Sequence, residues 1–268
     1  MIYSRLYKSA LLLVLFLLGN HVLIAQVPSK KNIKRQVYFT WGWNKDYFTK
    51  STLHFYDPAA GYNFKLYHVT AHDRPNYNAI SLNIETFAIP QYSYRLGWFF
   101  KNHPNSGIEI NFDHAKYVMD GSQTAHLKGT IGENTFDQDT LIGPSFLKFE
   151  HTNGANFYLL NYFRTLSLFS REKFSITIFG KAGAGTVIPK TDVTIFGTRL
   201  DNKYHVAGWI VGAEADARFT FFDHLYLEGG MKVAYADYMN VLVVGDGRAN
   251  HSFGAFEFIG GLGYQLGF

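Results

Sequence analysis

The sequence predicts an all-β protein: a transmembrane antiparallel up-and-down β-barrel, for which eight strands are favoured and ten are possible. Three observations support this prediction. Many segments alternate apolar and polar residues with a period of two, as strands with two different faces do. Beyond the N-terminal region, no apolar run is long enough for a membrane helix. Short and long connections also alternate along the chain. Because only helices and closed barrels satisfy every backbone group in lipid, these observations together indicate a barrel.

Composition agrees with a barrel and excludes several other classes. Aromatic residues make up 18% of the 268 residues, 25 residues are glycine, and only 17% are charged. The mean hydropathy of −0.09 is far below that of a helical membrane protein. The absence of cysteine rules out disulfides and thiolate metal sites. The net charge is +4, but no basic face with interleaved aromatics extends beyond residues 30–35, so nucleic acid is not an expected partner.

Residues 1–25 are predicted to be a signal peptide. Arg5 and Lys8 precede an apolar run at residues 10–18 that is too short to span a bilayer, and Ala25 is a suitable cleavage residue. The remaining residues, 26–268, are expected to form one barrel domain exported to the outer membrane.

The closing strand, residues 252–268, shows the two faces most clearly. Leu262, Tyr264 and Leu266 alternate with Gln265 and glycines. The strand ends on Phe268 and resembles the last strand of outer-membrane barrels, whose terminal Phe is an assembly signal. This resemblance implies the barrel assembly machinery as a partner.

Seven further segments alternate well enough to be predicted as wall strands. In chain order they are residues 36–44, 91–101, 107–118, 156–169, 173–188, 205–221 and 224–238. The outward face of 156–169 includes Arg164, which is tolerable only near the rim of the barrel, where its charged end can reach the interface.

The connections match an eight-stranded barrel with both termini in the periplasm. Three are short (102–106, 170–172 and 222–223) and four are long (45–90, 119–155, 189–204 and 239–251). Short turns are expected to be periplasmic and long loops extracellular. Residues 119–143 have the composition of a mobile loop. Residues 62–72 also alternate and could pair with 79–88, either as a hairpin outside the membrane or as a ninth and tenth wall strand; eight strands are favoured.

The same alternation assigns charged side chains to the barrel interior. The inward positions include four cations and six anions: Arg95, Glu109, Asp113, Lys181, Glu214, Asp216, Arg218, Glu228, Lys232 and Glu257. Buried charges must be paired or hydrated, and the interior of an eight-stranded barrel is just wide enough for side chains to fill. We therefore expect a network of ion pairs that plugs the lumen. A proton path or a catalytic use of these charges is the alternative.

No phosphate-binding loop, dinucleotide fingerprint or His-Glu-x-x-His motif is present, and no cofactor or metal is expected. Asp113, Glu150 and His151 are weak catalytic candidates, since they could meet Ser145 near the outer rim. His114 and Lys116 could contact lipopolysaccharide phosphates there, although ordinary polarity of the rim explains them as well.

Several short motifs resemble a family of uncharacterised outer-membrane β-barrel proteins of Bacteroidetes type. They are Trp41-Gly42-Trp43-Asn44, Asp73-Arg74-Pro75, Ile89-Pro90-Gln91-Tyr92, Phe112-Asp113-His114-Ala115-Lys116 and Glu150-His151-Thr152. The resemblance implies a barrel in the outer membrane, but it implies no activity and no catalytic residue.

The expected function is therefore a structural or surface-interaction role without catalysis, for a barrel with a plugged polar lumen. Its expected surroundings are outer-membrane lipid and lipopolysaccharide, and it is expected to be a monomer. A lipid A- or phospholipid-modifying enzyme at the outer rim and a narrow pore or small-solute transporter are the two alternatives.

Overall fold

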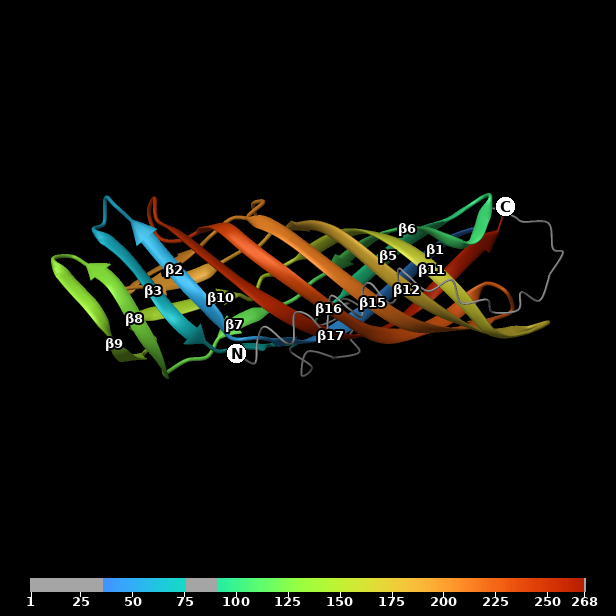
Figure 1. Ribbon diagram of the computed structural model, residues 1–268, viewed down its shortest axis with the longest axis horizontal. Coiled ribbons are helices and arrows are strands. Elements are labelled where there is room, and N and C mark those ends of the chain that lie inside the picture. Colours follow the sequence, from blue (N-terminus) through green and yellow to red (C-terminus); the bar gives the residue numbers. More distant parts are fainter. Residues whose placement is uncertain (1–35, 76–90, 268) are drawn as a thin grey trace, which may run out of the picture. The chain divides into compact units, whose positions relative to one another are not determined.

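The computed structural model describes residues 36–75 and 91–267, and all of their regular structure is β (Figure 1). No helix in these two ranges is long and apolar enough to cross a membrane. The predicted signal peptide (1–25), the possible strand at 79–88 and the terminal Phe268 lie outside the described residues.

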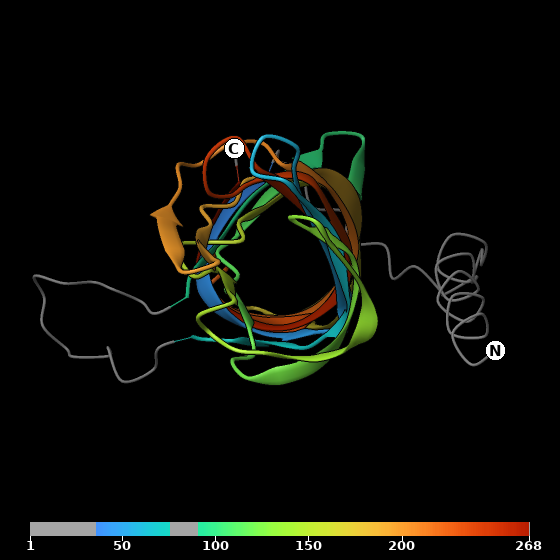
Figure 2. The same ribbon diagram turned by 90° about the vertical axis from the view of Figure 1, so that its left-hand side faces the viewer.

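Eight antiparallel strands close into a ring. In ring order they are β1 (Gln36–Phe48), β5 (Ser93–Phe100), β6 (His103–Asp113), β11 (Phe157–Arg171), β12 (Phe174–Val187), β15 (Gly208–Phe221), β16 (Leu225–Leu242) and β17 (Arg248–Gly267). The first and last strands complete the ring, with pairs running from Gln36↔Gly267 to Phe48↔Ala255. Figure 2 shows the ring end-on. The prediction of eight wall strands is confirmed.

The ring has an apolar outer face. Exposed large hydrophobic side chains alternate outward on seven of the eight wall strands, among them Trp43, Ile110, Leu160, Val233 and Leu262. On β12 the large side chains at Phe174, Ile176 and Ile178 are half-buried. Because closed sheets leave no backbone group unpaired, such a face can lie against lipid. Arg164 is exposed on this outer face, opposite Ser106 and Gly180, towards the end of the ring with the short turns.

The strands continue past the ring at the end with the long connections, and we call this part the outer head. Four strands extend the ring sheet from the first residues of β17: β2 (Ser51–Asp57), β3 (Tyr62–Val69), β8 (Gln123–Ile131) and β9 (Asn134–Ile142). Five short strands form a second sheet: β14 (Thr198–Asp201), β13 (Asp192–Ile195), β10 (Leu147–His151), β7 (Tyr117–Met119) and β4 (Ala71–Asp73). The segment at 62–72 thus belongs to the head and not to the wall.

A hydrophobic core joins the two head sheets. Phe55 of β2 meets Phe149 of β10 edge to face, with ring centroids 5.5 Å apart, and stacks on Phe64 of β3 at 5.4 Å. All three side chains are fully buried. The core reaches down into the ring through Phe157 and Ile210. The outer end of the barrel is therefore closed by packed apolar side chains.

Several predicted boundaries are wrong for a common reason: the chain keeps forming strands beyond the ring. The predicted strand 107–118 ends in the ring at Asp113, because both its neighbours stop there, and its last residues pair in the second sheet as β7. The predicted loop 239–251 is mostly strand, with only residues 243–247 between β16 and β17. The predicted mobile segment 119–143 holds the paired strands β8 and β9.

Candidate functional site

The structure places all ten charged side chains assigned to the lumen inside the ring, none of them more than 8% exposed. They come from six of the eight wall strands, β5, β6, β12, β15, β16 and β17, because alternate residues of each strand point inward. Isolated charges would be too costly in this interior, so their pairing decides how the site is built.

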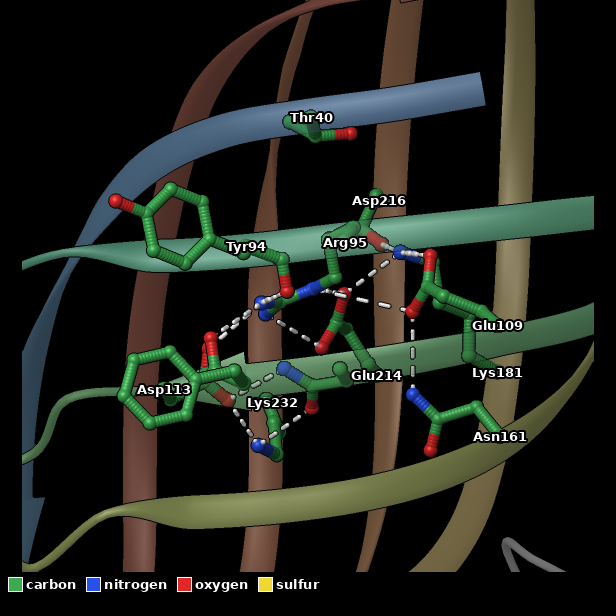
Figure 3. Close-up of polar contacts among 12 residues, drawn as sticks. Thr40, Tyr94, Arg95, Glu109, Asp113, Asn161, Lys181, Glu214, Asp216 and Lys232 are labelled. Carbon is green, nitrogen blue, oxygen red and sulfur yellow. Dashed lines mark hydrogen bonds and ion pairs between the residues drawn. The ribbon is translucent and has the colours of Figure 1, made fainter. Parts of the chain in front are cut away.

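Arg95 connects three acids across the lumen (Figure 3). Its Nη1 donates to Asp113 Oδ1 at 2.7 Å, its Nη2 to Glu214 Oε2 at 3.2 Å, and its Nε lies 3.8 Å from Glu109 Oε1. Glu214 is on β15, far around the ring from Arg95 on β5. The planar guanidinium suits this role because it offers several donors in fixed directions.

Lys181 is the second centre of the network (Figure 3). Its Nζ lies 2.8 Å from Glu214 Oε1, 2.9 Å from Glu109 Oε2 and 2.9 Å from Asp216 Oδ2. Glu228 follows at 3.5 Å. One ammonium group therefore compensates the negative charge of four carboxylates.

Lys232 supplies a third cation near the outer end of the network. Its Nζ contacts Asp113 Oδ2 and lies 3.2 Å from both Glu257 Oε1 and Asn111 Oδ1. Asp113 is thereby shared between Lys232 and Arg95. These contacts link β6, β16, β17 and β5 across the lumen.

Arg218 ends the network on the side of the short turns. Its Nε donates to Glu228 Oε2 at 2.6 Å, and its guanidinium lies over the rings of Tyr38, Phe179 and Tyr226. With Phe163, these rings form a buried aromatic cluster. The interior thus has three layers: this aromatic cluster, the ion-pair network, and the apolar core that extends into the head.

The weak catalytic candidates do not converge. Asp113 is held by Arg95 and Lys232 in the network, whereas Glu150 lies 3.1 Å from Lys148 and 3.5 Å from Arg74. Among the described contacts, none joins Asp113, Glu150 and His151 to one another. Ser145 is exposed. The arrangement offers no nucleophile–base pair among these candidates.

His151 instead belongs to a buried cluster in the head. Its Nε2 lies 3.1 Å from Nε2 of His251, and Thr191 Oγ1 lies 3.0 Å from its Nδ1. Tyr117 and Tyr238 complete the surroundings. Burial, with His251 alongside, holds the pKa of His151 well below its ordinary value. The two histidines are neutral packing groups that join β10 to β17.

At the outer rim, His114 stacks on Tyr92 with ring centroids 4.7 Å apart, and its Nδ1 lies 2.9 Å from Asn156 Oδ1. Burial lowers the pKa of His114. Its surroundings thus favour the neutral form, which weakens the case for binding of a lipid phosphate by this side chain.

Two features were missed by reasoning from sequence. The first is the inward aromatic cluster. The alternation puts Tyr38 and Phe179 on inner faces, but it does not indicate that these rings pack together or around Arg218. The predicted long loop 45–90 contains Asp46 and Asp73, although both are buried beside the network. Alternation carried through residues 36–48 would have placed Asp46 inside.

The closed ring, its apolar outer face, its short turns at one end and extended strands at the other define the class. The chain is an outer-membrane β-barrel protein, with the head on the extracellular side.

No protein-family model and no curated protein matches the chain. Among solved structures, the chain is similar to the attachment invasion locus protein Ail of Yersinia pestis, with 10% identity, 87% of this chain and 99% of that one covered, and a TM-score of 0.35. It is also similar to the outer-membrane protease OmpT of Escherichia coli (11% identity, 90% and 99% covered, TM-score 0.38). A third is OprG of Pseudomonas aeruginosa (10% identity, 88% and 98% covered, TM-score 0.37). The assignment to the class rests on the ring and its two faces.

Proposed function

We propose that this protein is a non-conducting outer-membrane barrel that displays its outer head for interactions at the cell surface. The observation that carries the proposal is the three-layer filling of the interior. The aromatic cluster, the ion-pair network and the apolar core succeed one another along the barrel axis, and each is buried. A barrel filled in this way is suited to anchoring a structure at the surface.

The head supports an interaction role because it is built of paired strands. The β8–β9 hairpin is paired along its whole length, from Gln123↔Ile142 to Ile131↔Asn134, and β9 has β8 as its one neighbour in the described sheet. A rigid surface loses little conformational entropy when it binds a partner. The head thus has the order that a recognition surface requires.

Ion conductance in planar bilayers tests the closed lumen. The full chain, reconstituted without other membrane proteins, is expected to give no stepwise currents, while a general porin in the same bilayers provides the positive control. Reproducible unitary currents would support the narrow-pore alternative instead.

The interaction role is tested by shortening the head. Replacing residues 123–142 by a two-residue turn removes the β8–β9 hairpin and leaves every ring strand intact. Cells carrying this variant are expected to retain the folded barrel but to lose adhesion to surfaces or to each other. Equal adhesion by both forms would argue for a purely structural role.

The lipid-modifying alternative has less support, because its candidate residues are engaged in separate contacts. Incubation of the reconstituted protein with lipid A and phospholipid, followed by mass spectrometry, is expected to show unchanged lipids. An acyl chain lost or gained would revive that alternative.

The proposal also includes the expected family, export route, assembly, oligomeric state and lipid contacts of the protein. Membership of the Bacteroidetes-type family, export by a signal peptide, assembly through Phe268, a monomeric state and contacts with lipopolysaccharide are each consistent with a small barrel of this design. N-terminal sequencing of the mature protein would test the cleavage after Ala25.

A further inference from the structure

A buried polar cluster lies at the outer end of the lumen network, where ring and head meet. Gln91 Nε2 is 2.9 Å from Asp46 Oδ2 and 3.4 Å from Asp73 Oδ2, so the two carboxylates are adjacent. Asn44 Nδ2 lies 2.9 and 3.1 Å from the two carboxylate oxygens of Asp46. All four residues are buried. We call Asn44, Asp46, Asp73 and Gln91 the rim cluster.

Negative charge exceeds positive charge around the rim cluster. Asp46 and Asp73 add two buried carboxylates to the six of the network, against four buried cations. Asp46 faces Glu257 directly across β1 and β17. Lys45 reaches Asp73 at 3.0 Å from a partly exposed position, and Lys116 also acts on Asp73 electrostatically. Because buried carboxylates without compensation are costly, the cluster favours additional positive charge.

A second, independent feature is a set of oxygens without donors. Asn44 Oδ1, Gln91 Oε1 and Asp73 Oδ1 are buried and make no hydrogen bond. Both amides turn their nitrogens towards the carboxylates and leave their oxygens unpaired. Buried acceptors of this kind usually have a partner, so their lack of one needs an explanation.

A cation between the carboxylates provides that explanation. If each amide turned by half a turn, its oxygen would take the place of its nitrogen and point at Asp46 or Asp73. That orientation is repulsive without a cation and favourable with one, because carboxylate and amide oxygens are the ligands of hard cations such as Ca²⁺. Lys45, already partly exposed, would then be released towards solvent.

The rim cluster also brings together three of the short motifs found in the sequence. Asn44, Asp73 and Gln91 come from the motifs at 41–44, 73–75 and 89–92. They lie on β1, on β4 and just before β5, and none of them belongs to the ion pairs that fill the lumen. The proposed function leaves these motifs without a role.

We propose that the rim cluster is a binding site for a divalent, oxygen-preferring cation, with Asp46, Asp73, Asn44 and Gln91 as ligands. In the described part of the chain no three acidic, histidine or cysteine side chains form a metal-binding group. The rim cluster combines two carboxylates with two amides instead. This ligand set suits Ca²⁺ and does not suit Zn²⁺. A bound cation would tie β4 of the head to β1 and β5 of the ring.

Calcium binding to the full chain, refolded in detergent free of lipopolysaccharide, tests the proposal. Isothermal titration calorimetry is expected to show one saturable Ca²⁺ site per chain, and Ca²⁺ is expected to raise the unfolding temperature. Asp73→Asn and Gln91→Leu should each weaken binding at least tenfold and reduce that rise in temperature. Asp137→Asn, which alters an exposed carboxylate on the β8–β9 hairpin, should leave both unchanged.

The shift between folded and heat-unfolded forms on electrophoresis shows which variants have folded, and Gln91→Leu provides a second variant if Asp73→Asn does not fold. Absence of saturable binding to the wild-type protein would overturn the proposal. Unchanged affinity in the folded rim variants would do so as well. If acid raised the unfolding temperature while Ca²⁺ did not change it, protons and not a cation would neutralise the cluster. That result would also overturn the proposal.

Discussion

The guanidinium of Arg218 lies 3.9 Å from the centre of the Tyr226 ring, inside a barrel whose outer face is apolar. Tyr38 and Phe179 lie at 4.1 and 4.0 Å, and Glu228 accepts a hydrogen bond from Nε at 2.6 Å. A cation over aromatic faces is attracted by their negative charge, most strongly where water is excluded. Arg218 therefore joins the aromatic layer of the lumen to the ionic layer.

Replacing Arg218 by Leu should lower the free energy of unfolding by about 3–5 kcal/mol, because it leaves Glu228 buried with fewer partners. Urea titration in lipid vesicles measures this loss. The double variant Arg218→Leu/Glu228→Leu should regain part of the stability, since both charges are then removed. Arg171→Leu, at the exposed end of β11, should leave the stability unchanged. An unchanged unfolding curve for Arg218→Leu would contradict the importance of the pair.

Gly97→Ala should destabilise the barrel by about 1–3 kcal/mol through overpacking. A Cβ at Gly97 would overlap the ring of Tyr38, which is fixed among Phe163, Phe179 and Arg218. Gly121→Ala is the matched control, because a Cβ there meets nothing within 4 Å. Equal stability of the two variants, measured by the same urea titration, would show that Tyr38 can move aside.

Acid should weaken the head through His151. The pKa of this residue is lowered in the folded state, so the folded protein binds fewer protons than the unfolded chain, whose histidine titrates near 6.5. The stability contributed by neutral His151 is present above about pH 6.5 and is lost as the pH falls below it, by at most about 1.4 kcal/mol per pH unit.

Near-ultraviolet circular dichroism between pH 7.5 and 4.5 follows this change, since His151 lies among Tyr117 and Tyr238. His151→Gln should reduce the pH dependence and leave the part due to His251, whose pKa burial lowers to about 3. His103→Gln, at the exposed start of β6, should leave the pH dependence unchanged. A wild-type pH profile in His151→Gln would assign the acid sensitivity to another group.

Phe149→Ala should open the head without unfolding the ring. Phe149 contacts Phe55 at 5.5 Å and His151 at 4.9 Å, and its loss leaves a cavity between the two head sheets at a cost of about 3–5 kcal/mol. Limited proteolysis should then cleave within residues 119–155, while the wall strands stay protected. If proteolysis cleaved the wall strands together with the head, ring and head would fold as one cooperative unit.

The alternation of residues predicted the wall closely, because each wall strand separates two very different surroundings. The inward position of Arg95, Lys181 and Glu257 followed from parity alone. The ends of the wall strands could not be predicted from the alternation. A strand that leaves the ring for a second sheet keeps the same alternation of inward and outward residues. Tyr117 illustrates this: it continues the inward series after Asp113, yet it pairs with β4 and β10.

The sequence by itself determined the ring, its apolar outer face and which charges point inward, since a period of two is a local property of each strand. Only the tertiary structure decided which charges meet. Arg95 reaches Glu214 because the closed ring and its register set them opposite each other across the lumen. The same holds for Asp46 and Asp73, which fall in a predicted loop but lie buried side by side. Contacts across a closed barrel depend on the stagger of all eight strands, and no single segment encodes that stagger.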